Sequence, residues 1–274
     1  MEHVALITGA SRGIGLAFAE LLAQLKYNLL LVARNQDRLI LVQKRLQNDF
    51  DVKVDILSVD LSLAGSSQEL IDFAQKKRIG IEVVINNAAS GYCGGYSNLS
   101  WHQEMQMIHL NIISSVHLTK YFLNEMIERN SGSIINVVST AAFSPGPYMS
   151  SYVASKAYLL SYTESLAEEI KGSRVRLMAL CPGPTRTDFH HQSGMPVSNA
   201  ELRRMPTAGQ VAVYGWRLLQ KNKVVVIYGW PNKILVGLAK FLPRSLVRST
   251  MAVIKQKKLN LSRRKRRVCL FDSD

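Results

Sequence analysis

The sequence predicts a three-layer α/β fold, in which a doubly wound parallel sheet of about seven strands lies between two layers of helices. Short apolar runs alternate with segments of helical spacing along residues 1–230, and this alternation is typical of parallel sheets. A glycine-rich turn joins the first run to the first helical segment. We therefore expect one α/β domain over residues 1–230, followed by a helical, basic extension over 231–274 that is not an independent domain.

Composition sets limits on the class of protein. The chain has 274 residues, of which 47% are hydrophobic and 20% charged, as in soluble globular proteins. Cys93, Cys181 and Cys269 are far apart and form no CxxC motif, so we expect neither a disulfide framework nor a zinc site. No basic segment followed by an apolar stretch precedes the first strand. We therefore expect no signal peptide and a cytoplasmic location.

The first strand, predicted over residues 3–8, ends in a turn with three glycines, and a helix follows over 16–25. Gly9, Gly13 and Gly15 let the backbone turn sharply and approach a ligand. The free N–H groups at the start of the helix can bind a pyrophosphate. An ordinary tight turn is the alternative, but the order of strand, glycines and helix favours a nucleotide site.

The end of the second strand, predicted over residues 27–33, indicates which nicotinamide cofactor is used. An acid there would bind the ribose 2′-hydroxyl, whereas a base accommodates a 2′-phosphate. Arg34 occupies this position, Arg12 lies in the glycine turn, and the first acid, Asp37, comes three residues later. The pattern favours NADP(H) over NAD(H). The alternative is that Arg34 is a solvated loop residue.

The remaining elements follow in alternation. A capping box of Ser66 and Glu69 predicts the start of one helix, and Ser100 caps a long helix that reaches about Asn130. The other predicted helices cover 35–48, 150–171 and 207–220, and the other predicted strands cover 52–59, 81–85, 132–138, 175–180 and 224–228.

A candidate acid–base pair lies near the start of the helix predicted over 150–171. Tyr152 and Lys156 are four residues apart and share one face of that helix. The ammonium would stabilise the phenolate and lower the pKa of Tyr152. Such a pair also arises by chance, so its meaning depends on what surrounds it. Ser139, at the end of the preceding strand, can face Tyr152.

Taken together, these motifs resemble those of the short-chain dehydrogenase/reductase family, whose fold is of the Rossmann type. The similarity covers roughly residues 3–230, and Ala89 stands where the family has glycine. It implies catalytic roles for Asn111, Ser139, Tyr152 and Lys156. It implies cofactor contacts for Gly9, Ser11, Arg12, Gly13, Ile14, Gly15, Arg34, Asp60, Leu61, Asn87, Ala88, Tyr152, Lys156, Pro182, Gly183, Thr185 and Thr187.

The resemblance also implies a reaction. The chain would be an NADP(H)-dependent oxidoreductase that interconverts a carbonyl and an alcohol on a hydrophobic substrate. Tyr152 would donate the proton, Lys156 would lower the Tyr152 pKa and bind the ribose, Ser139 would hold the substrate oxygen, and Asn111 would position a water. The short region after Cys181 argues against an epimerase or dehydratase. The alternative class is a non-catalytic NADP-binding scaffold or a membrane-associated interaction protein.

In the family, the segment corresponding to residues 183–206 is a mobile lid over the substrate. We expect the substrate pocket to be lined by aromatic and other side chains, namely Tyr92, Tyr96, Phe143, Tyr148, Phe189, His190, His191 and Met195. The adjacent histidines lack a third ligand nearby, so we expect no metal site.

The extension is basic and amphipathic. Lys240, Arg244, Arg248 and Lys255 would form a basic stripe on a helix, and five Lys and Arg fill 263–267. This pattern suits the surface of an anionic membrane, although a helix packed on the body or on a partner subunit is the alternative. Nucleic acid is an unlikely partner because no aromatic residues interleave the basic run. The family resemblance implies a homodimer or homotetramer.

Overall fold

The computed structural model describes the chain over residues 3–271, with side chains described to residue 260. Its single sheet has seven parallel strands in the order β3-β2-β1-β4-β5-β6-β7. The strands are β1 (Val4–Thr8), β2 (Asn28–Ala33), β3 (Val54–Ser58), β4 (Ile81–Asn86), β5 (Gly132–Val137), β6 (Val175–Cys181) and β7 (Val225–Ile227). The predicted fold class is confirmed.

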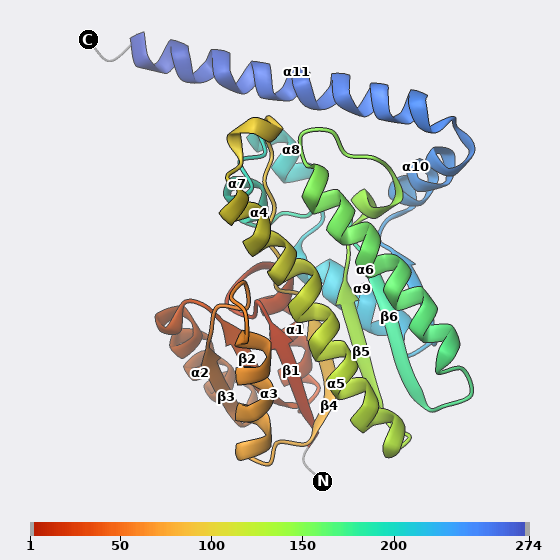
Figure 1. Cartoon of the computed structure of the whole chain (residues 1–274). Helices are drawn as coiled ribbons and strands as arrows, with labels where there is room; N and C mark the ends of the chain where they lie inside the picture. Colours follow the sequence, from red (N-terminus) through yellow and green to blue (C-terminus); the bar gives the residue numbers. More distant parts are fainter. Residues whose placement is uncertain (1–2, 272–274) are drawn as a thin grey trace.

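Helices cover both faces of the sheet (Figure 1). One face packs on α1 (Gly13–Gln24), α2 (Gln36–Phe50) and α9 (Ala208–Leu219). The other packs on α3 (Ser66–Lys76), α5 (Ser115–Glu128) and α6 (Ser150–Glu169). Alternate strand residues serve the two faces, so in β1 Ala5 and Ile7 point to the first core and Val4 and Leu6 to the second. This is why the strands read as continuous apolar runs.

The strand order reverses direction between β1 and β4. From β1 the chain proceeds outward to β2 and β3, and then returns to β4 on the other side of β1. Open α/β sheets bind ligands outside the carboxyl ends of the strands at such a switch point. The fold therefore places the ligand site beside the turn that follows β1.

The long helix expected from Ser100 to about Asn130 is divided into three segments. These are α4 (Trp101–Ile108), a π-helical segment η2 (His109–Ser114) and α5. Ser100 and Gln103 form a capping box, which confirms the predicted start. Asn111 lies in the π-helical segment, and such segments occur frequently at functional sites.

The capping box predicted at Ser66 and Glu69 is wrong. Gly65 precedes the helix in a left-handed conformation, with φ of 81°, and is its N-cap. Ser66 is the first helical residue, and its hydroxyl donates to the carbonyl oxygen of Leu63 over 2.6 Å. The glycine thus starts α3 one residue earlier than a serine cap would.

The extension forms two helices, α10 (Trp230–Phe241) and α11 (Arg244–Phe271). In Figure 1, α11 crosses above the carboxyl ends of the strands, on the side where α7 (Phe189–Gln192) and α8 (Asn199–Arg204) lie. Across the described part of the chain, no helix combines the length and apolarity needed to cross a bilayer.

Candidate functional site

A cavity of about 990 Å³ lies at the carboxyl ends of the strands. It runs from the glycine turn after β1, past Tyr152, to the helices of the extension. Every residue predicted to contact the cofactor lines it, with the exception of Gly15. The fold thus brings together side chains that are up to 178 residues apart in the sequence, between Gly9 and Thr187.

The glycine turn has the conformation that a phosphate cradle requires. Gly13 has φ of 58°, in the left-handed region that favours glycine. A Cβ at Gly15 would lie 2.3 Å from the carbonyl oxygen of Gly9, so only glycine allows α1 to start this close to β1. Asn87 holds the turn, because its Nδ2 donates to the carbonyl oxygen of Thr8 over 3.0 Å. Gly15 therefore shapes the cavity without lining it.

Three arginines gather at the β2 end of the cavity. Arg12, Arg34 and Arg38 all line it. Burial lowers the pKa of Arg12, and the charges of Arg38 and Arg34 lower it further. Arg34 Nη1 lies 3.6 Å from Asp60 Oδ2, and Asp37 does not line the cavity. Sequence reasoning missed Arg38, which lies in the first turn of α2.

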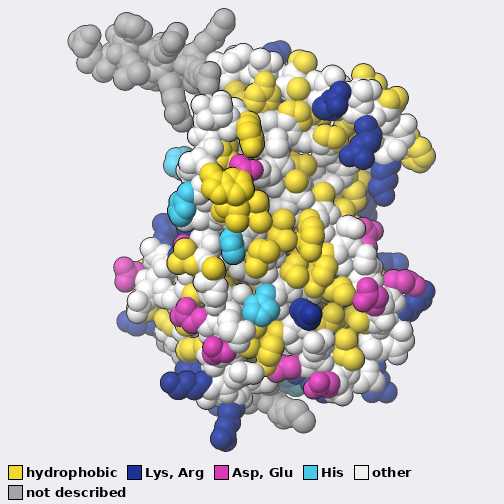
Figure 2. Space-filling view, in the orientation of Figure 1, with side chains coloured by type: hydrophobic (Ala, Val, Ile, Leu, Met, Phe, Trp, Pro, Cys, Tyr) yellow, Lys and Arg dark blue, Asp and Glu magenta, His cyan; other side chains and the backbone are white. Residues whose placement is uncertain are grey.

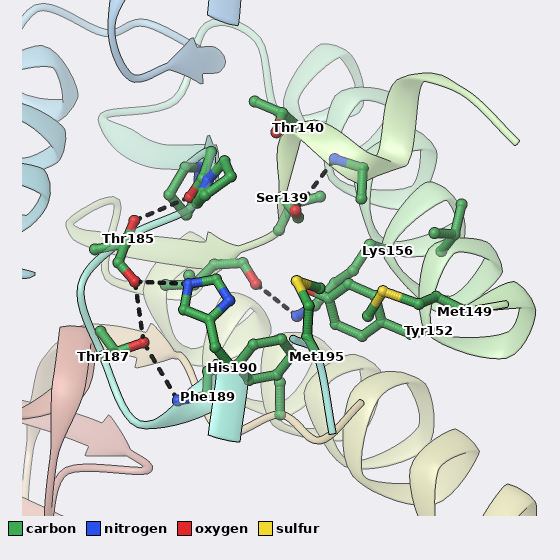
Figure 3. Close-up of a pocket in the computed structure, with 18 of the residues that line it drawn as sticks. Ser139, Thr140, Met149, Tyr152, Lys156, Thr185, Thr187, Phe189, His190 and Met195 are labelled. Atoms are coloured by element: carbon green, nitrogen blue, oxygen red, sulfur yellow. Dashed lines mark hydrogen bonds between the residues drawn. The ribbon is translucent and has the colours of Figure 1, made fainter. Parts of the chain in front are cut away.

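Ser139, Tyr152 and Lys156 converge at the other part of the cavity (Figure 3). Burial raises the pKa of Tyr152 to about 12, and a hydrogen bond from Ser139 opposes the shift. Lys156 Nζ donates to the carbonyl oxygen of Val137 over 2.8 Å, and burial lowers the pKa of Lys156 to about 8. The expected lowering of the Tyr152 pKa by Lys156 is not seen, because burial dominates and the ammonium is directed to Val137.

Asn111 does not line the cavity. Its side chain is fully buried and joins two segments. Oδ1 accepts from the Ser90 backbone N–H over 2.9 Å, and Nδ2 donates to the Ser90 carbonyl oxygen and to Ser155 Oγ over 2.9 and 3.0 Å. In this geometry the side chain clamps the loop after β4 to α6, and both of its N–H groups are used.

Only half of the residues predicted for the substrate pocket line the cavity, namely Phe143, Phe189, His190 and Met195. The rings of Phe189 and Tyr152 are 5.3 Å apart, centroid to centroid. The other four, Tyr92, Tyr96, Tyr148 and His191, lie outside the cavity lining. Tyr96 is 76% exposed on a short 3₁₀ turn, and His191 lies on the exposed side of α7.

His190 has one bonded and one unbonded ring nitrogen. Nε2 lies 3.0 Å from the carbonyl oxygen of Thr185, and among the described residues Nδ1 has no hydrogen-bond partner. A carbonyl can only accept, so Nε2 carries the hydrogen. Burial lowers the pKa of His190, and Lys255 and Lys258 add to this shift. The imidazole is therefore neutral and holds the start of the 183–206 segment.

The extension lines the cavity as well, which sequence reasoning missed. The contributing side chains of α10, α11 and their junction are Asn232, Leu235, Val236, Leu238, Ala239, Leu242, Leu246, Val247, Thr250, Met251, Ile254 and Lys255. Lys255 was expected in a basic surface stripe. Instead it lies partly buried, with Nζ 3.3 Å from Met149 Sδ.

Comparison with known proteins agrees with this geometry. A family model described as short chain dehydrogenase matches residues 3–196. The ketoacyl reductase HetN of Nostoc sp. is 30% identical over 241 residues, which cover 86% of this chain and 82% of that protein. Hydroxysteroid dehydrogenase-like protein 1 of Gallus gallus is 31% identical over 241 residues, covering 87% of this chain and 72% of that protein.

Solved structures share the fold. A 7beta-hydroxysteroid dehydrogenase superposes with a TM-score of 0.83 at 24% identity, over 91% of this chain and 96% of that one. A short-chain dehydrogenase from Sphingobium yanoikuyae in complex with NADPH superposes with a TM-score of 0.77 at 26% identity, over 88% of this chain and 96% of that one.

Proposed function

The chain is a member of the short-chain dehydrogenase family, and we propose that it is an NADP(H)-dependent oxidoreductase that interconverts a carbonyl and an alcohol on a hydrophobic substrate. One observation carries the proposal. A single cavity has Arg12, Arg34 and Arg38 at one end and Ser139, Tyr152 and Lys156 along it. The first set suits a phosphorylated ribose, and the second suits a reacting oxygen.

The residues present fit a nicotinamide dinucleotide phosphate. The turn around Gly13 and the N-terminus of α1 can hold the pyrophosphate. The guanidinium groups of Arg12, Arg34 and Arg38 can bind the 2′-phosphate, since arginine donates to phosphate with two parallel N–H groups. Of the two carboxylates that follow β2 and β3, Asp37 lies outside the cavity lining and Asp60 is paired with Arg34. NADP(H) is thus favoured over NAD(H).

In the proposed reduction, the cofactor and the protein have separate tasks. The bound NADPH supplies the hydride, and the chain positions the carbonyl and supplies a proton. Tyr152, whose raised pKa keeps its proton at neutral pH, donates that proton to the carbonyl oxygen. Ser139, which hydrogen-bonds Tyr152, orients the same oxygen. Lys156, whose Nζ donates to the carbonyl oxygen of Val137, would bind the cofactor ribose.

The substrate class follows from the walls of the remaining cavity. Phe143, Phe189, Met195 and the leucines of α10 and α11 are apolar, so they suit a hydrophobic skeleton. Related proteins are named a ketoacyl reductase and a 7beta-hydroxysteroid dehydrogenase, and both names denote carbonyl or hydroxyl substrates.

The test combines binding and turnover. Purified protein is titrated with NADPH and NADH while nicotinamide fluorescence is followed, and a panel of hydrophobic ketones is then offered with NADPH. We expect tighter binding of NADPH and ketone-dependent NADPH oxidation that Tyr152→Phe abolishes while binding persists. Binding of neither cofactor would overturn the enzyme proposal and favour the alternative of a membrane-associated interaction protein.

We further propose two kinds of partner, further copies of this chain and an anionic membrane surface. Figure 2 shows hydrophobic side chains gathered over α4, α5 and α6, where Trp101, Ile113 and Tyr158 are exposed. This face suits a homodimer or homotetramer, because exposed apolar patches mark association sites. On the extension, Phe241 at the end of α10 is 90% exposed, and the exposed Arg244 and Arg248 follow it on α11. That combination suits an anionic membrane surface.

A further inference from the structure

Lys255 is a cation inside the apolar part of the cavity. It projects from α11 and lines the cavity together with Met149, the N-cap residue of α6, and Met195 of the segment after α7. Its Nζ lies 3.3 Å from Met149 Sδ and 4.0 Å from Met195 Sδ. Thioether sulfur is only a weak acceptor, so the contacts that the ammonium makes in this structure satisfy it poorly.

The charged and titratable groups around Lys255 leave it without a counterion. Its electrostatic neighbours are the Cys93 thiol and Lys258. Lys258 is itself paired with Glu201 over 2.6 Å, and His190 close by is neutral. Burial raises the pKa of Cys93, so this thiol carries no negative charge. Among the described residues, no carboxylate lies within ion-pair distance of Lys255 Nζ.

Holding an ammonium partly buried and without a counterion costs free energy, and an anion that binds beside it reduces this cost. Lys255 lines the cavity in which the substrate is proposed to lie. We propose that Lys255 binds a carboxylate on the substrate, so that the enzyme acts on hydrophobic keto acids or hydroxy acids. This inference rests on the proposed function and names its substrate class.

The position of Lys255 also indicates where the acid lies. Met149 and Met195, which flank the Lys255 ammonium, pack in one apolar cluster with Tyr152 and Phe189. The carboxylate therefore sits near the carbonyl that Tyr152 protonates, and a short apolar chain would join the two groups. One ammonium matches one negative charge, which suits a carboxylate better than a phosphate monoester.

Isothermal titration calorimetry measures ligand binding directly, so it tests the role of Lys255 without requiring turnover. The protein saturated with NADP⁺ is titrated with a series of benzoylalkanoates of increasing chain length, each compared with its methyl ester and with a phosphate monoester of matched length. We expect at least one acid to bind about tenfold or more tighter than its ester, the ratio expected for a hydrogen bond to a charged group. Lys255→Gln should abolish that difference, whereas Lys257→Gln, an exposed neighbour on α11, should keep it.

The outcomes separate this inference from the proposed function. Equal binding of acid and ester, or an unchanged ratio in Lys255→Gln, would overturn the inference even if ketones are reduced. Tighter binding of the phosphate would overturn the choice of carboxylate. Failure of every ketone to oxidise NADPH would count against the proposed function alone.

Thermal unfolding supplies a second measurement. If Lys255 served only to hold α11, Lys255→Met would lower the melting temperature. A residue kept for ligand binding behaves in the opposite way, because methionine suits the sulfur-rich site better than an unpaired ammonium. We expect Lys255→Met to raise the melting temperature while losing the preference for acids; a lower melting temperature would contradict this role.

Discussion

Lys258 of α11 and Glu201 of α8 form an ion pair, with Nζ 2.6 Å from Oε1. The pair joins the extension to the segment between β6 and α9, which carries the cavity-lining residues Phe189 and Met195. Hydrogen bonds from Lys258 and Ser198 lower the pKa of Glu201 to about 2, so the carboxylate is charged throughout the physiological range. The pair is thus one of the contacts that connect the two walls of the substrate region.

We predict that breaking this pair weakens substrate binding and leaves the chemical step intact. Both side chains are about 40% exposed, at 43% and 42%, so the pair contributes at most about 1 kcal/mol. Glu201→Lys and Lys258→Glu should each raise the KM for a reduced ketone by up to about fivefold, with kcat unchanged. The double variant should restore the KM. Additive effects in the double variant would show that the pair does not form, and Lys257→Glu serves as the control for charge.

The arginine cluster leads to a prediction about cofactor choice. Arg34→Asp places a carboxylate where a 2′-phosphate would lie, so the dissociation constant for NADPH should rise by about tenfold or more. NADH, which has no such phosphate, should bind as well as before or better. Lys44→Asp makes the same charge change on an exposed part of α2 and should alter neither. Parallel loss of both cofactors would mean that Arg34 only supports the fold.

The buried groups predict a pH profile for NADPH-dependent reduction. Lys156 has its pKa lowered to about 8, so it loses its charge as the pH rises through that value, whereas Tyr152, near 12, keeps its proton. The kcat/KM for NADPH should therefore be level below about pH 8 and fall above it. Lys156→Arg, which stays charged, should move the fall to higher pH. A fall that persists unchanged in this variant would assign it to another group.

The exposed surface of the extension predicts binding to anionic lipid. Vesicles that contain phosphatidylserine should sediment the protein, and vesicles of phosphatidylcholine alone should not. Phe241→Ser should weaken the binding, because the ring is 90% exposed and available for insertion. Exposed Leu41 on α2 provides the matched control, and Leu41→Ser should have no effect. Equal sedimentation by both kinds of vesicle would contradict the electrostatic part of the proposal.

The sheet and the cofactor end of the cavity were predictable because they depend on local sequence. Each strand is an apolar run ended by a turn, and parallel strands bring their carboxyl ends to one edge. It could therefore be predicted, without knowing how the side chains pack, that residues as distant as Asp60 and Thr185 line the same cavity. The position of Gly15 beside Gly9 follows from the same local geometry.

The substrate end was not predictable, because it depends on how separate helices pack. An amphipathic pattern in 231–260 shows that one face is apolar, but not which surface that face covers. Helical spacing alone therefore places Lys255 in the basic stripe, whereas in the packed structure its Nζ contacts Met149 Sδ. The Tyr152 pKa was misjudged because spacing reveals the neighbouring charge of Lys156, whereas burial emerges only from the packed structure.

Transfer of deuterium tests the central claim most directly. Purified protein is mixed with NADPH deuterated at the transferring C4 position and with a hydrophobic ketone, and the alcohol product is examined by mass spectrometry. The account predicts one deuterium on the carbon that bore the carbonyl, and no alcohol when Tyr152 is replaced by Phe. No alcohol product from any ketone, with NADPH bound, would contradict the claim that this cavity carries out hydride transfer.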